Sequence, residues 1–570
     1  MTRAIKPTLP GPEKRNILIT SALPYCNNLP HLGTLIGCVL SADVFARYCR
    51  LRGYNVLYIC GTDEHGTATE VKAMEEKTTP ELICQKYFAL HKEVYDWFVI
   101  DFDNFGRTAT EAQNKITQDI FLKLHKNGYI SEQTMKQQWC DNCKMSLADR
   151  YIIGVCPKCG SEGARGDQCD SCDHLLNPTE LKNPKCKVCQ TSPVQKDSEH
   201  LFLDLNKIQG KAEEWYKAAI QKDKWSNNSI TTTNTFLKEG LKSRCITRDL
   251  KWGVPVPLPK YEGKVFYVWF DAPIGYISIT NGIVPEWEKW WKNPDNVQLY
   301  QFIGKDNILF HSLMFPASLI GTGENYTLVR HLNSTEFLNY EGTKFSKSDN
   351  VGIFGDQAKE TNISCEVYRY YLLAVRPEQQ DANFSWAELA ERNNNELLKN
   401  LGNFSVRVLK FVENHYKKII PEYDPTDEQS EEAASECLKE FYKELETYAT
   451  NMEGVKLKEG IKQAMNLSSI CNKYMQKWEP WTAAKTNAKF AGSAINILMN
   501  VFMVVCAALE PFIPTFAAKI YYMTNWKRGT REETLLGYIL DAKDHMKVLT
   551  VIPAKHEIGE VLPIFRESKI

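Results

Sequence analysis

Two short motifs, more than three hundred residues apart, carry side chains suited to binding a polyphosphate. Residues 30–34 (PHLGT) place a histidine where an apolar run gives way to a helical pattern, and residues 344–348 (KFSKS) carry two lysines three positions apart. A helix start offers free backbone N–H groups to an anion, and ammonium groups on a mobile loop suit closure onto a pyrophosphate as its charge develops. We therefore predict that the two motifs bind one nucleoside triphosphate from opposite sides.

Each motif alone has an ordinary explanation. A histidine in such a turn is usually a satisfied surface or core residue, and a short run of lysines is usually a solvated loop. The known glycine-rich alternatives are not present, because the chain has no Gly-x-x-x-x-Gly-Lys-Ser/Thr and residues 321–323 (GTG) lack the third glycine of a dinucleotide fingerprint. The nucleotide hypothesis therefore depends on the two motifs together.

Cysteines provide the second chemical signal. Of 18 cysteines, eight form four Cys-x-x-Cys pairs with turn residues between them, and the others are scattered singly. Four thiolates around one metal form a closed tetrahedral zinc site, so the pairs predict two structural Zn²⁺ ions, although the spacing does not fix which pairs share a metal. The pairs are Cys140/Cys143, Cys156/Cys159, Cys169/Cys172 and Cys186/Cys189.

Composition indicates an ordinary globular protein of two to four domains. The 570 residues are 43% apolar and 24% charged, with a formal net charge of −1, which argues against indiscriminate DNA binding. Residues 1–15 have no apolar core of a signal peptide, and the apolar stretch Ala494–Leu509 is interrupted by Asn496 and Asn500, as in a buried bundle helix. With the cysteine pattern, these features predict a cytoplasmic protein that contacts no membrane.

The elements that must position the first motif form a strand–helix–strand unit. We predict strands at Asn16–Ala22 and Asn55–Cys60 on either side of a helix at Leu32–Arg50, which implies a right-handed parallel crossover. Strand-like runs return at Lys264–Phe270 and Asn296–Ile303, after the cysteine-rich region. The fold class is therefore α/β, a Rossmann-like doubly wound parallel sheet interrupted by a zinc-knuckle insertion.

From Trp386 onward the apolar spacing is almost wholly helical, which predicts an all-α bundle after the sheet domain. We expect no appended dimerisation domain after this bundle, and therefore a monomer. The predicted segments are a flexible tail at 1–15, the two halves of the Rossmann-like sheet domain at 16–132 and 245–340, the cysteine-rich insertion at 133–244, the segment with the KFSKS loop at 341–392, the helical domain at 393–540 and a C-terminal tail at 541–570.

Taken together, these motifs resemble those of the methionyl-tRNA synthetases, a family of class I aminoacyl-tRNA synthetases. The histidine turn resembles the family's first signature, with Thr34 in place of the usual His or Asn, and KFSKS resembles the second. Three further stretches are specific to the family, and the resemblance extends from about Asn16 to about Lys485. These stretches are ALPY at 22–25, CGTDEHG at 60–66 and WFDAPIGY at 269–276.

The resemblance implies activation of L-methionine by ATP with Mg²⁺ and transfer of methionine to the terminal ribose of tRNA(Met). Such chemistry needs positioning and charge stabilisation but no protein nucleophile. The residues implied as catalytic are His31, Thr34, Lys344 and Lys347. These four, with Gly33, Gly304 and Asp306, are the implied ATP-binding residues.

Methionine offers an ammonium group and a polarisable thioether, so a carboxylate and aromatic walls are its natural complement. Asp63 follows a strand end and can pair with the ammonium, whereas the aromatic residues would otherwise be read as ordinary core. The implied methionine-binding residues are Leu23, Tyr25, Asp63, Trp269, Ala272, Pro273, Tyr276 and His311.

The resemblance also implies that 16–132 and 245–340 form the Rossmann catalytic domain, that 341–392 is the KFSKS loop and stem-contact segment, and that 393–540 is the helical anticodon-binding domain. We expect no general tRNA-binding domain after it. The resemblance further implies individual RNA contacts and the metal pairing. Asn403 and Arg407, four apart on one helix face, and Trp481, at a helix start, are implied to read unstacked anticodon bases. For the metals it implies a nested arrangement, in which the two inner cysteine pairs share one zinc and the two outer pairs share the other.

Three alternative functions fit the sequence less well. A leucine, isoleucine, valine or cysteine synthetase is disfavoured because the first three carry a longer editing insertion and the fourth places zinc in its substrate pocket. A small-molecule nucleotidyltransferase has no use for the helical half. A zinc-knuckle RNA-binding protein without activity would not need both nucleotide motifs together with Asp63.

Overall fold

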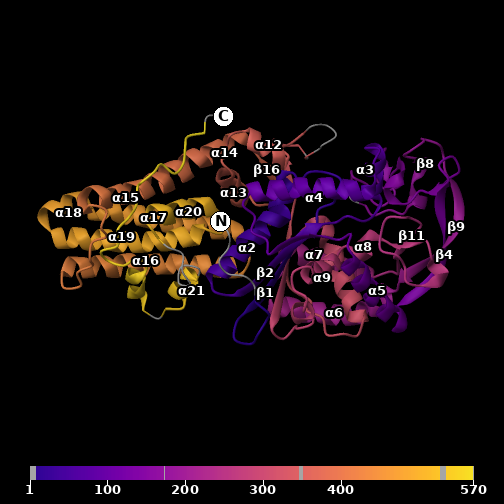
Figure 1. The fold of residues 1–570 in the computed structure, drawn as a ribbon, viewed down its shortest axis with the longest axis horizontal. Coiled ribbons are helices and arrows are strands. Elements are labelled where there is room, and N and C mark those ends of the chain that lie inside the picture. The colour runs from indigo at the N-terminus through magenta and orange to yellow at the C-terminus, as the bar shows by residue number, and fades with distance from the viewer. Residues whose placement is uncertain are drawn as a thin grey trace.

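The protein is elongated, with an α/β lobe at one end and a helical bundle at the other (Figure 1). The computed structural model describes residues 8–172, 174–343, 345, 351–526, 534–542 and 544–568. The α/β lobe contains the first half of the chain, including the cysteine-rich insertion, and the sheet strands that follow the insertion. The bundle contains most of the C-terminal third.

Among the described residues, five parallel strands form the central sheet in the order β14–β13–β1–β2–β3. Consecutive strands β1, β2 and β3 run outward on one side, and β13 and β14 are added on the other, as in a doubly wound sheet. The strands are β1 (Asn16–Ser21), β2 (Asn55–Thr62), β3 (Asn104–Arg107), β13 (Val297–Gly304) and β14 (Val329–Thr335).

Both faces of the sheet are covered, which explains why β1 is a continuous apolar run. Ile17 and Ile19 point into one hydrophobic core, whereas Leu18 between them points into a second core on the opposite face. The first core includes α2 (Leu40–Leu51) and α4 (Pro80–Trp97) and continues into the bundle. The second core includes α5 (Glu111–Lys126), α6 (Leu205–Lys222), α9 (Gly275–Asn281) and α11 (Phe315–Gly321).

The crossover helix predicted at Leu32–Arg50 is present but not uniform. A first turn, α1 (Leu32–Thr34), leads into a π-helical segment, η1 (Leu35–Val39), and then into α2. A second π-helical segment, η6 (Phe310–Met314), follows β13 and the short 3₁₀ turn η5 (Lys305–Asn307). Both wide turns therefore lie in the helical segment that follows a strand of the central sheet, and such bulges are frequent at functional sites.

The strand predicted at Lys264–Phe270 is largely wrong. Only β12 (Val265–Phe266) is extended, paired with β11 (Thr247–Arg248), and the chain then turns into helix α8 (Val268–Asp271). Most of this run is buried, and a short apolar run without alternation fits a strand or a buried helical turn equally well.

The cysteine-rich insertion is built on a long antiparallel ladder. β4 (Ile130–Cys140) pairs with β9 (Val194–Leu203) over nearly their whole length, and the chain between them carries the cysteine pairs. Its smaller strands and helices are β5 (Met145–Ser146), η2 (Asp149–Tyr151), β6 (Ile152–Val155), β7 (Ala164–Arg165), η3 (Pro178–Glu180) and β8 (Lys182–Cys186). α7 (Asn227–Glu239) and β10 (Arg244–Cys245) return the chain to the catalytic lobe.

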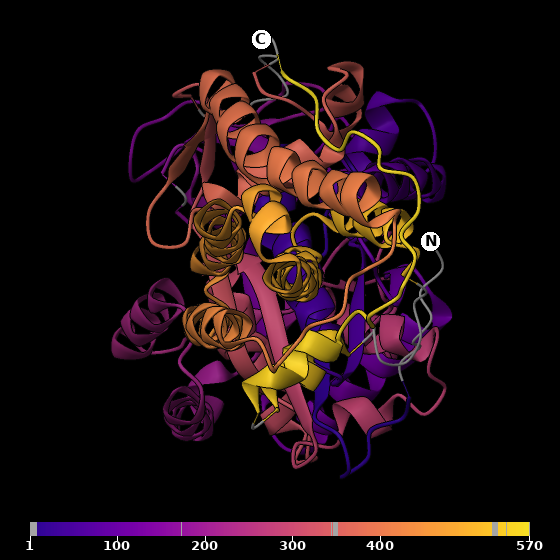
Figure 2. The same ribbon diagram turned by 90° about the vertical axis from the view of Figure 1, so that its left-hand side faces the viewer.

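The bundle is arranged around α19 (Ala488–Leu509), whose residues from Phe490 onward are all buried. The described residues contain two helices long and apolar enough to span a bilayer, Leu32–Leu51 and α19, and both are mostly or wholly covered by protein. The other bundle helices, several seen end-on in Figure 2, are η7 (Asn393–Gly402), α15 (Asn403–Tyr416), α16 (Glu428–Glu453), α17 (Leu457–Trp478), α18 (Pro480–Thr486) and α20 (Pro514–Met523).

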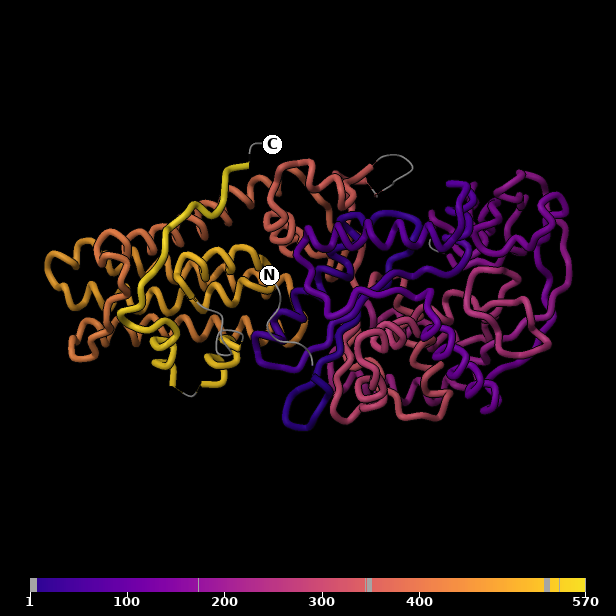
Figure 3. The backbone as a smooth tube through the Cα atoms, viewed as in Figure 1, coloured from indigo at the N-terminus to yellow at the C-terminus, as the bar shows by residue number. Residues whose placement is uncertain are grey.

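The ends of the chain are tied to this framework. The C-terminal segment crosses the bundle as an extended strap (Figure 3), and the Asn393 side chain donates to the Arg566 carbonyl and the Ser568 hydroxyl at 3.0 Å. In the segment predicted as a flexible tail, Arg15 donates to Glu453 at 2.6 Å. Between the lobes, Arg369 of α13 (Cys365–Ala374) is fully buried and donates to the buried carboxylate of Asp43.

Candidate active site and metal centres

The first predicted motif forms a capped helix start at the carboxyl end of β1. His31 is the N-cap of α1, and its Nδ1 accepts a hydrogen bond from the Thr34 backbone N–H at 3.3 Å. Burial lowers the pKa of His31 to about 4, so the ring is neutral at physiological pH. Because Nδ1 is the acceptor, the proton resides on Nε2, which is then the atom that can donate to a phosphate oxygen.

Gly33 is required by the histidine itself. A Cβ at this position would lie 2.9 Å from Cε1 and 3.0 Å from Nδ1 of the His31 ring. The resemblance implied that Gly33 is one of the ATP-binding residues. The structure adds that only glycine leaves the imidazole room to fold back over the helix start.

The second motif lies next to the first in space. Lys344 and Lys347 lie outside the described residues, but Phe345 between them stacks on His31, with ring centroids 4.7 Å apart and an interplanar angle of 14°. Beyond the motif, Leu32 donates to the Ile353 carbonyl at 3.4 Å, and Gly355 donates to the Pro30 carbonyl at 2.9 Å. Phe345 between the lysines and the segment that follows them are therefore anchored at the histidine turn.

Asp63 is a buried carboxylate at the end of β2. Its backbone N–H donates to the Pro24 carbonyl at 2.8 Å, and its carbonyl accepts from Cys26 at 3.2 Å, which places it beside Tyr25. Burial, followed by the nearby charges of Asp271 and Glu64, raises the pKa of Asp63 well above its usual range. Among the described residues nothing donates to its Oδ1. A buried carboxylate oxygen without a donor is suited to a cationic ligand.

Aromatic rings stand beside this carboxylate. Trp269 stacks on Phe310 with centroids 3.8 Å apart, and Tyr25 meets Trp269 edge-on at 6.4 Å. Behind them, the Tyr276 hydroxyl lies 2.9 Å from His311 Nε2, and His311 Nδ1 donates to the Asn307 carbonyl at 2.9 Å. This second bond fixes the tautomer of His311, so Nε2 accepts from Tyr276.

The remaining predicted pocket residues lie on the same elements. Leu23 is half-buried and packs near Gly275, and Ala272 and Pro273 follow directly after α8. Gly304 ends β13, and Asp306 lies in the exposed turn η5 that follows. All of these, with His31 and Asp63, lie near the carboxyl edge of the parallel sheet or on the helices that cover it.

Three residues of the site were missed from the sequence. Phe310 forms the second half of the Trp269 stack, and His65 and Asp271 are joined by a 2.8 Å contact between His65 Nδ1 and an Asp271 oxygen. Gln113 donates to the Asp271 backbone carbonyl at 2.6 Å, which fixes this buried pair. His65 and Asp271 lie inside the family stretches quoted above, so their polar type within apolar surroundings was an available signal, whereas Phe310 looked like core.

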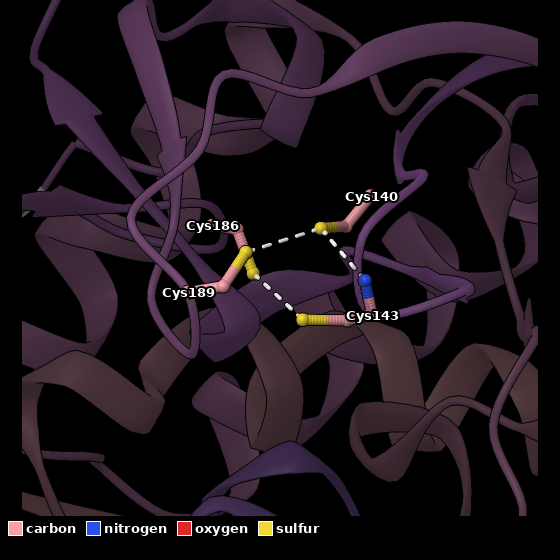
Figure 4. Close-up of side chains that lie close together, drawn as sticks. All are labelled: Cys140, Cys143, Cys186 and Cys189. Atoms are coloured by element: carbon pink, nitrogen blue, oxygen red, sulfur yellow. Dashed lines mark hydrogen bonds between the residues drawn. The ribbon is translucent and has the colours of Figure 1, made fainter.

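The eight cysteines form two four-thiol clusters in the insertion. Within each cluster all four Sγ atoms lie within 4.8 Å of one another, and the chain has no disulfide among its cysteines. In the outer cluster (Figure 4) the Sγ atoms of Cys140 and Cys189 are 3.4 Å apart and those of Cys143 and Cys186 are 3.9 Å apart. In the inner cluster the Sγ atoms of Cys156 and Cys172 are 3.9 Å apart and those of Cys159 and Cys169 are 3.6 Å apart.

These spacings fit a metal. A tetrahedral centre with Zn–S bonds of about 2.3 Å has sulfur atoms about 3.8 Å apart. The pairing that the spacing left open is nested, as the resemblance implied: outer pairs together and inner pairs together. The members are Cys140, Cys143, Cys186 and Cys189 in one cluster and Cys156, Cys159, Cys169 and Cys172 in the other.

The predicted RNA-contacting residues lie in the bundle, away from the sheet (Figure 1). Asn403 begins α15, and Arg407, one turn later, donates to the Asn472 side chain of α17; both are exposed. Trp481 lies in the first turn of α18 behind Pro480 and is 38% exposed, which is unusual for a tryptophan.

Comparisons with known proteins agree with one another. A family model described as tRNA synthetases class I (M) matches residues 17–409, and one described as the anticodon binding domain of methionyl tRNA ligase matches residues 424–553. The chain is 52% identical over 567 residues to the cytoplasmic methionine–tRNA ligase of Arabidopsis thaliana, covering 98% of this chain and 70% of that protein.

The cytoplasmic human protein of the same name is 49% identical over 564 residues, covering 98% of this chain and 61% of its own length. The cytoplasmic location predicted from the sequence agrees with these names. In fold, the chain is similar to a Mycobacterium tuberculosis methionyl-tRNA synthetase in complex with methionyl-adenylate, with a TM-score of 0.77, 20% identity and coverage of 97% and 99% of the two chains. The chain belongs to the methionyl class I tRNA synthetases.

Proposed function

We propose that this chain activates L-methionine with ATP and transfers it to tRNA(Met), the reaction of a methionine–tRNA ligase. The observation that carries the proposal is the Oδ1 of buried Asp63 that accepts no hydrogen bond from any described residue, linked through Tyr25 to the Trp269–Phe310 stack and on the same sheet edge as the His31 turn. A substrate with an ammonium group and a polarisable apolar side chain satisfies both features at once.

In the first step, the methionine carboxylate attacks the α-phosphorus of ATP, and pyrophosphate leaves to give methionyl-adenylate. His31 donates from Nε2 to the phosphates at the helix start, Thr34 adds its hydroxyl, and Lys344 and Lys347 neutralise the leaving pyrophosphate. Gly304 and Asp306 face the ribose, where a carboxylate accepts from a hydroxyl. Each of these groups holds or stabilises charge, and none forms a covalent bond to substrate.

Contacts at both ends of the methionine molecule orient it in the pocket. Its ammonium pairs with Asp63, and its thioether lies against Tyr25, Trp269 and the buried Tyr276–His311 pair. The walls are completed by Leu23, Ala272 and Pro273. In the second step, a hydroxyl of the terminal tRNA ribose attacks the methionyl carbonyl, and AMP leaves.

The bundle supplies the tRNA specificity. Asn403 and Arg407 present hydrogen-bonding groups, and Trp481 presents an exposed ring on which an unstacked anticodon base can stack. Support comes from their position on solvent-facing turns of α15 and α18 at one end of the bundle (Figure 1).

Two zinc ions complete the insertion, one in each four-cysteine cluster. Because all four positions of each are taken by thiolates, they serve structure and leave no open coordination site for a substrate. Mg²⁺ enters with the phosphates of ATP. We further propose that the chain works as a monomer without contact with a membrane; sedimentation of the purified chain and flotation with lipid vesicles test these two statements.

ATP–pyrophosphate exchange with a panel of amino acids tests the reaction. We expect exchange with methionine and none with leucine, isoleucine, valine or cysteine at equal concentration. Removing the charge by Asp63→Asn should raise the KM for methionine by about 10- to 150-fold, because a charge-assisted hydrogen bond contributes about 1.5–3 kcal/mol. Exchange driven by a different amino acid, or a wild-type KM in Asp63→Asn, would refute the proposal.

A further inference from the structure

One side chain of the cysteine-rich insertion, that of Arg150, contacts Tyr25 of the proposed methionine site. We propose that Arg150 is a positioning residue for methionine, holding the Tyr25 ring in place and supplying positive charge near Asp63. This inference rests on the function proposed above and adds a role for a residue outside the two nucleotide motifs and the family stretches.

Arg150 lies at the edge of the insertion that faces the sheet. It belongs to η2, immediately before β6, and β6 leads directly to Cys156 of the inner cluster. Its guanidinium carbon lies 5.3 Å from the centroid of the Tyr25 ring, within the range of a cation–π contact. Only 22% of its side chain is exposed, so this contact is partly shielded from water.

The residue is held from two directions. Its backbone N–H donates to the Thr67 hydroxyl at 3.3 Å, and Thr67 begins α3 (Thr67–Glu75), the helix after the Asp63 loop. Its Nε lies 3.8 Å from the carboxylate of Asp167, a residue of the insertion. Arg150 therefore connects the insertion to the start of α3, directly after the loop that carries Asp63.

Tyr25 links Arg150 to the pocket by direct contacts. The ring contacts Arg150 and also meets Trp269 edge-on at 6.4 Å. Its backbone pairs with Asp63 in an isolated parallel bridge. A change at Arg150 therefore acts on the aromatic wall and the carboxylate of the pocket together.

The charges around Asp63 make a nearby cation useful. The carboxylates of Asp271 and Glu64 disfavour its ionised form, and Arg150 is the cation that favours it. The other local partners are already engaged: Arg107 pairs with Glu64 at 2.6 Å, and His65 contacts Asp271 at 2.8 Å. Arg150 thus opposes the rise in the pKa of Asp63 and favours its ionised form when an ammonium group binds.

The adjoining residue fixes η2 to the catalytic lobe. Asp149 accepts from Arg248 Nε at 3.2 Å and from its Nη2 at 3.3 Å, and the Arg248 guanidinium lies 3.7 Å from the Tyr267 ring. Arg248 lies in β11, and Tyr267 follows directly after its partner strand β12, so η2 is held in place just before the chain enters the inner cysteine cluster. The contacts of η2 therefore fix the position of Arg150, which is not a freely moving surface residue.

The test uses the full chain with three substitutions: Arg150→Met, Arg150→Lys and, as the matched control, Arg165→Met. Arg165 lies in the same insertion, where it pairs with Asp170 at 3.1 Å, and no contact joins it to Tyr25 among those of the described residues. We expect Arg150→Met to weaken methionine binding in equilibrium dialysis about tenfold. Arg150→Lys should recover part of this loss, and Arg165→Met should bind methionine as the wild type does.

Two readouts separate positioning from a general defect. The KM for ATP and the metal content should be unchanged in Arg150→Met, and the inhibition constant of 4-(methylthio)butanoate, which lacks the amino group, should change less than the Kd for methionine. Equal methionine binding in Arg150→Met and Arg165→Met would overturn the inference, as would a parallel loss of ATP affinity or metal. A wild-type chain that binds no methionine would instead refute the proposed function.

Discussion

Replacing Gly33 by alanine isolates the position of the His31 ring from the stability of the fold. The added Cβ would stand 2.9 Å from His31 Cε1 and 3.0 Å from Nδ1, closer than such atoms approach one another. Backbone strain is not the issue, since Gly33 lies in an ordinary helical turn and alanine is a better helix former than glycine. The imidazole must therefore turn away from the helix start.

The magnitude follows from the two contacts that the ring gives up. Nδ1 loses its hydrogen bond from Thr34, worth about 0.5–1.5 kcal/mol, and the ring loses its stack on Phe345, worth about 0.5–1.5 kcal/mol. If this total of about 1–3 kcal/mol is what holds Nε2 in place for the phosphates, adenylate formation should slow by about 5- to 150-fold. The gain in helix propensity, up to about 1 kcal/mol, offsets part of any loss of stability.

ATP–pyrophosphate exchange at saturating methionine measures the expected fall, and urea unfolding measures stability. Gly210→Ala is the matched control, because Gly210 lies exposed in helix α6 and a Cβ there meets nothing within 4 Å. We expect the control to keep full exchange activity. Gly33→Ala with the wild-type exchange rate would show that the imidazole position does not matter and that our reading of the helix start is wrong.

Three further predictions follow from other parts of the molecule. Lys347→Ala should slow adenylate formation at least tenfold, about 1.4 kcal/mol, with methionine affinity nearly unchanged; exchange at the parental rate would contradict its role. Cys143→Ser or Cys156→Ser should each lower the metal content from two equivalents to one by elemental analysis, and loss of both metals from one substitution would argue against independent clusters. Burial lowers the pKa of His91 to about 4, so the unfolded chain takes up a proton below about pH 6.5 that the folded chain refuses. Between pH 7 and 5 the wild type should therefore lose up to about 2 kcal/mol of unfolding free energy relative to His91→Gln in urea titrations, and a constant difference would refute this sign.

Much of the catalytic frame was predictable because its signals are local. β1 and β2 are apolar runs that end at polar turns, and parallel strands necessarily bring those turns to one edge of the sheet. His31 and Asp63 could thus each be assigned to the end of a strand from the sequence alone. The cysteine clusters were predictable for a similar reason, since Cys-x-x-Cys spacing has few uses in a reducing compartment.

The parts that were not predictable depend on distant contacts. The π-helical segments η1 and η6 arise within sequences whose apolar spacing fits an ordinary α-helix, so the pattern gave no sign of the wider turn. Phe345 stacks on a histidine more than three hundred residues away, and the C-terminal strap finds its partners on η7. Neither contact has a signature in local periodicity.

Other contacts between distant residues join the lobe with the proposed methionine site to the bundle with the proposed RNA-contacting residues. Arg369 is fully buried between the lobes and bonded to Asp43, and removing one partner of such a pair typically costs about 3–5 kcal/mol because it leaves a buried charge alone. Nearby, buried Arg376 donates to Ser41 of α2 and to Glu378, whose carboxylate accepts from the first turn of α17 at the Lys458 N–H. Helix α17 then runs 22 residues, about 33 Å, toward the end of the bundle that carries Trp481. Arg376 and Glu378 therefore connect the crossover helix that begins at His31 to the helix that leads to Trp481. The distance between the two proposed sites is thus set by these hydrogen bonds and by one continuous helix, and not by a linker.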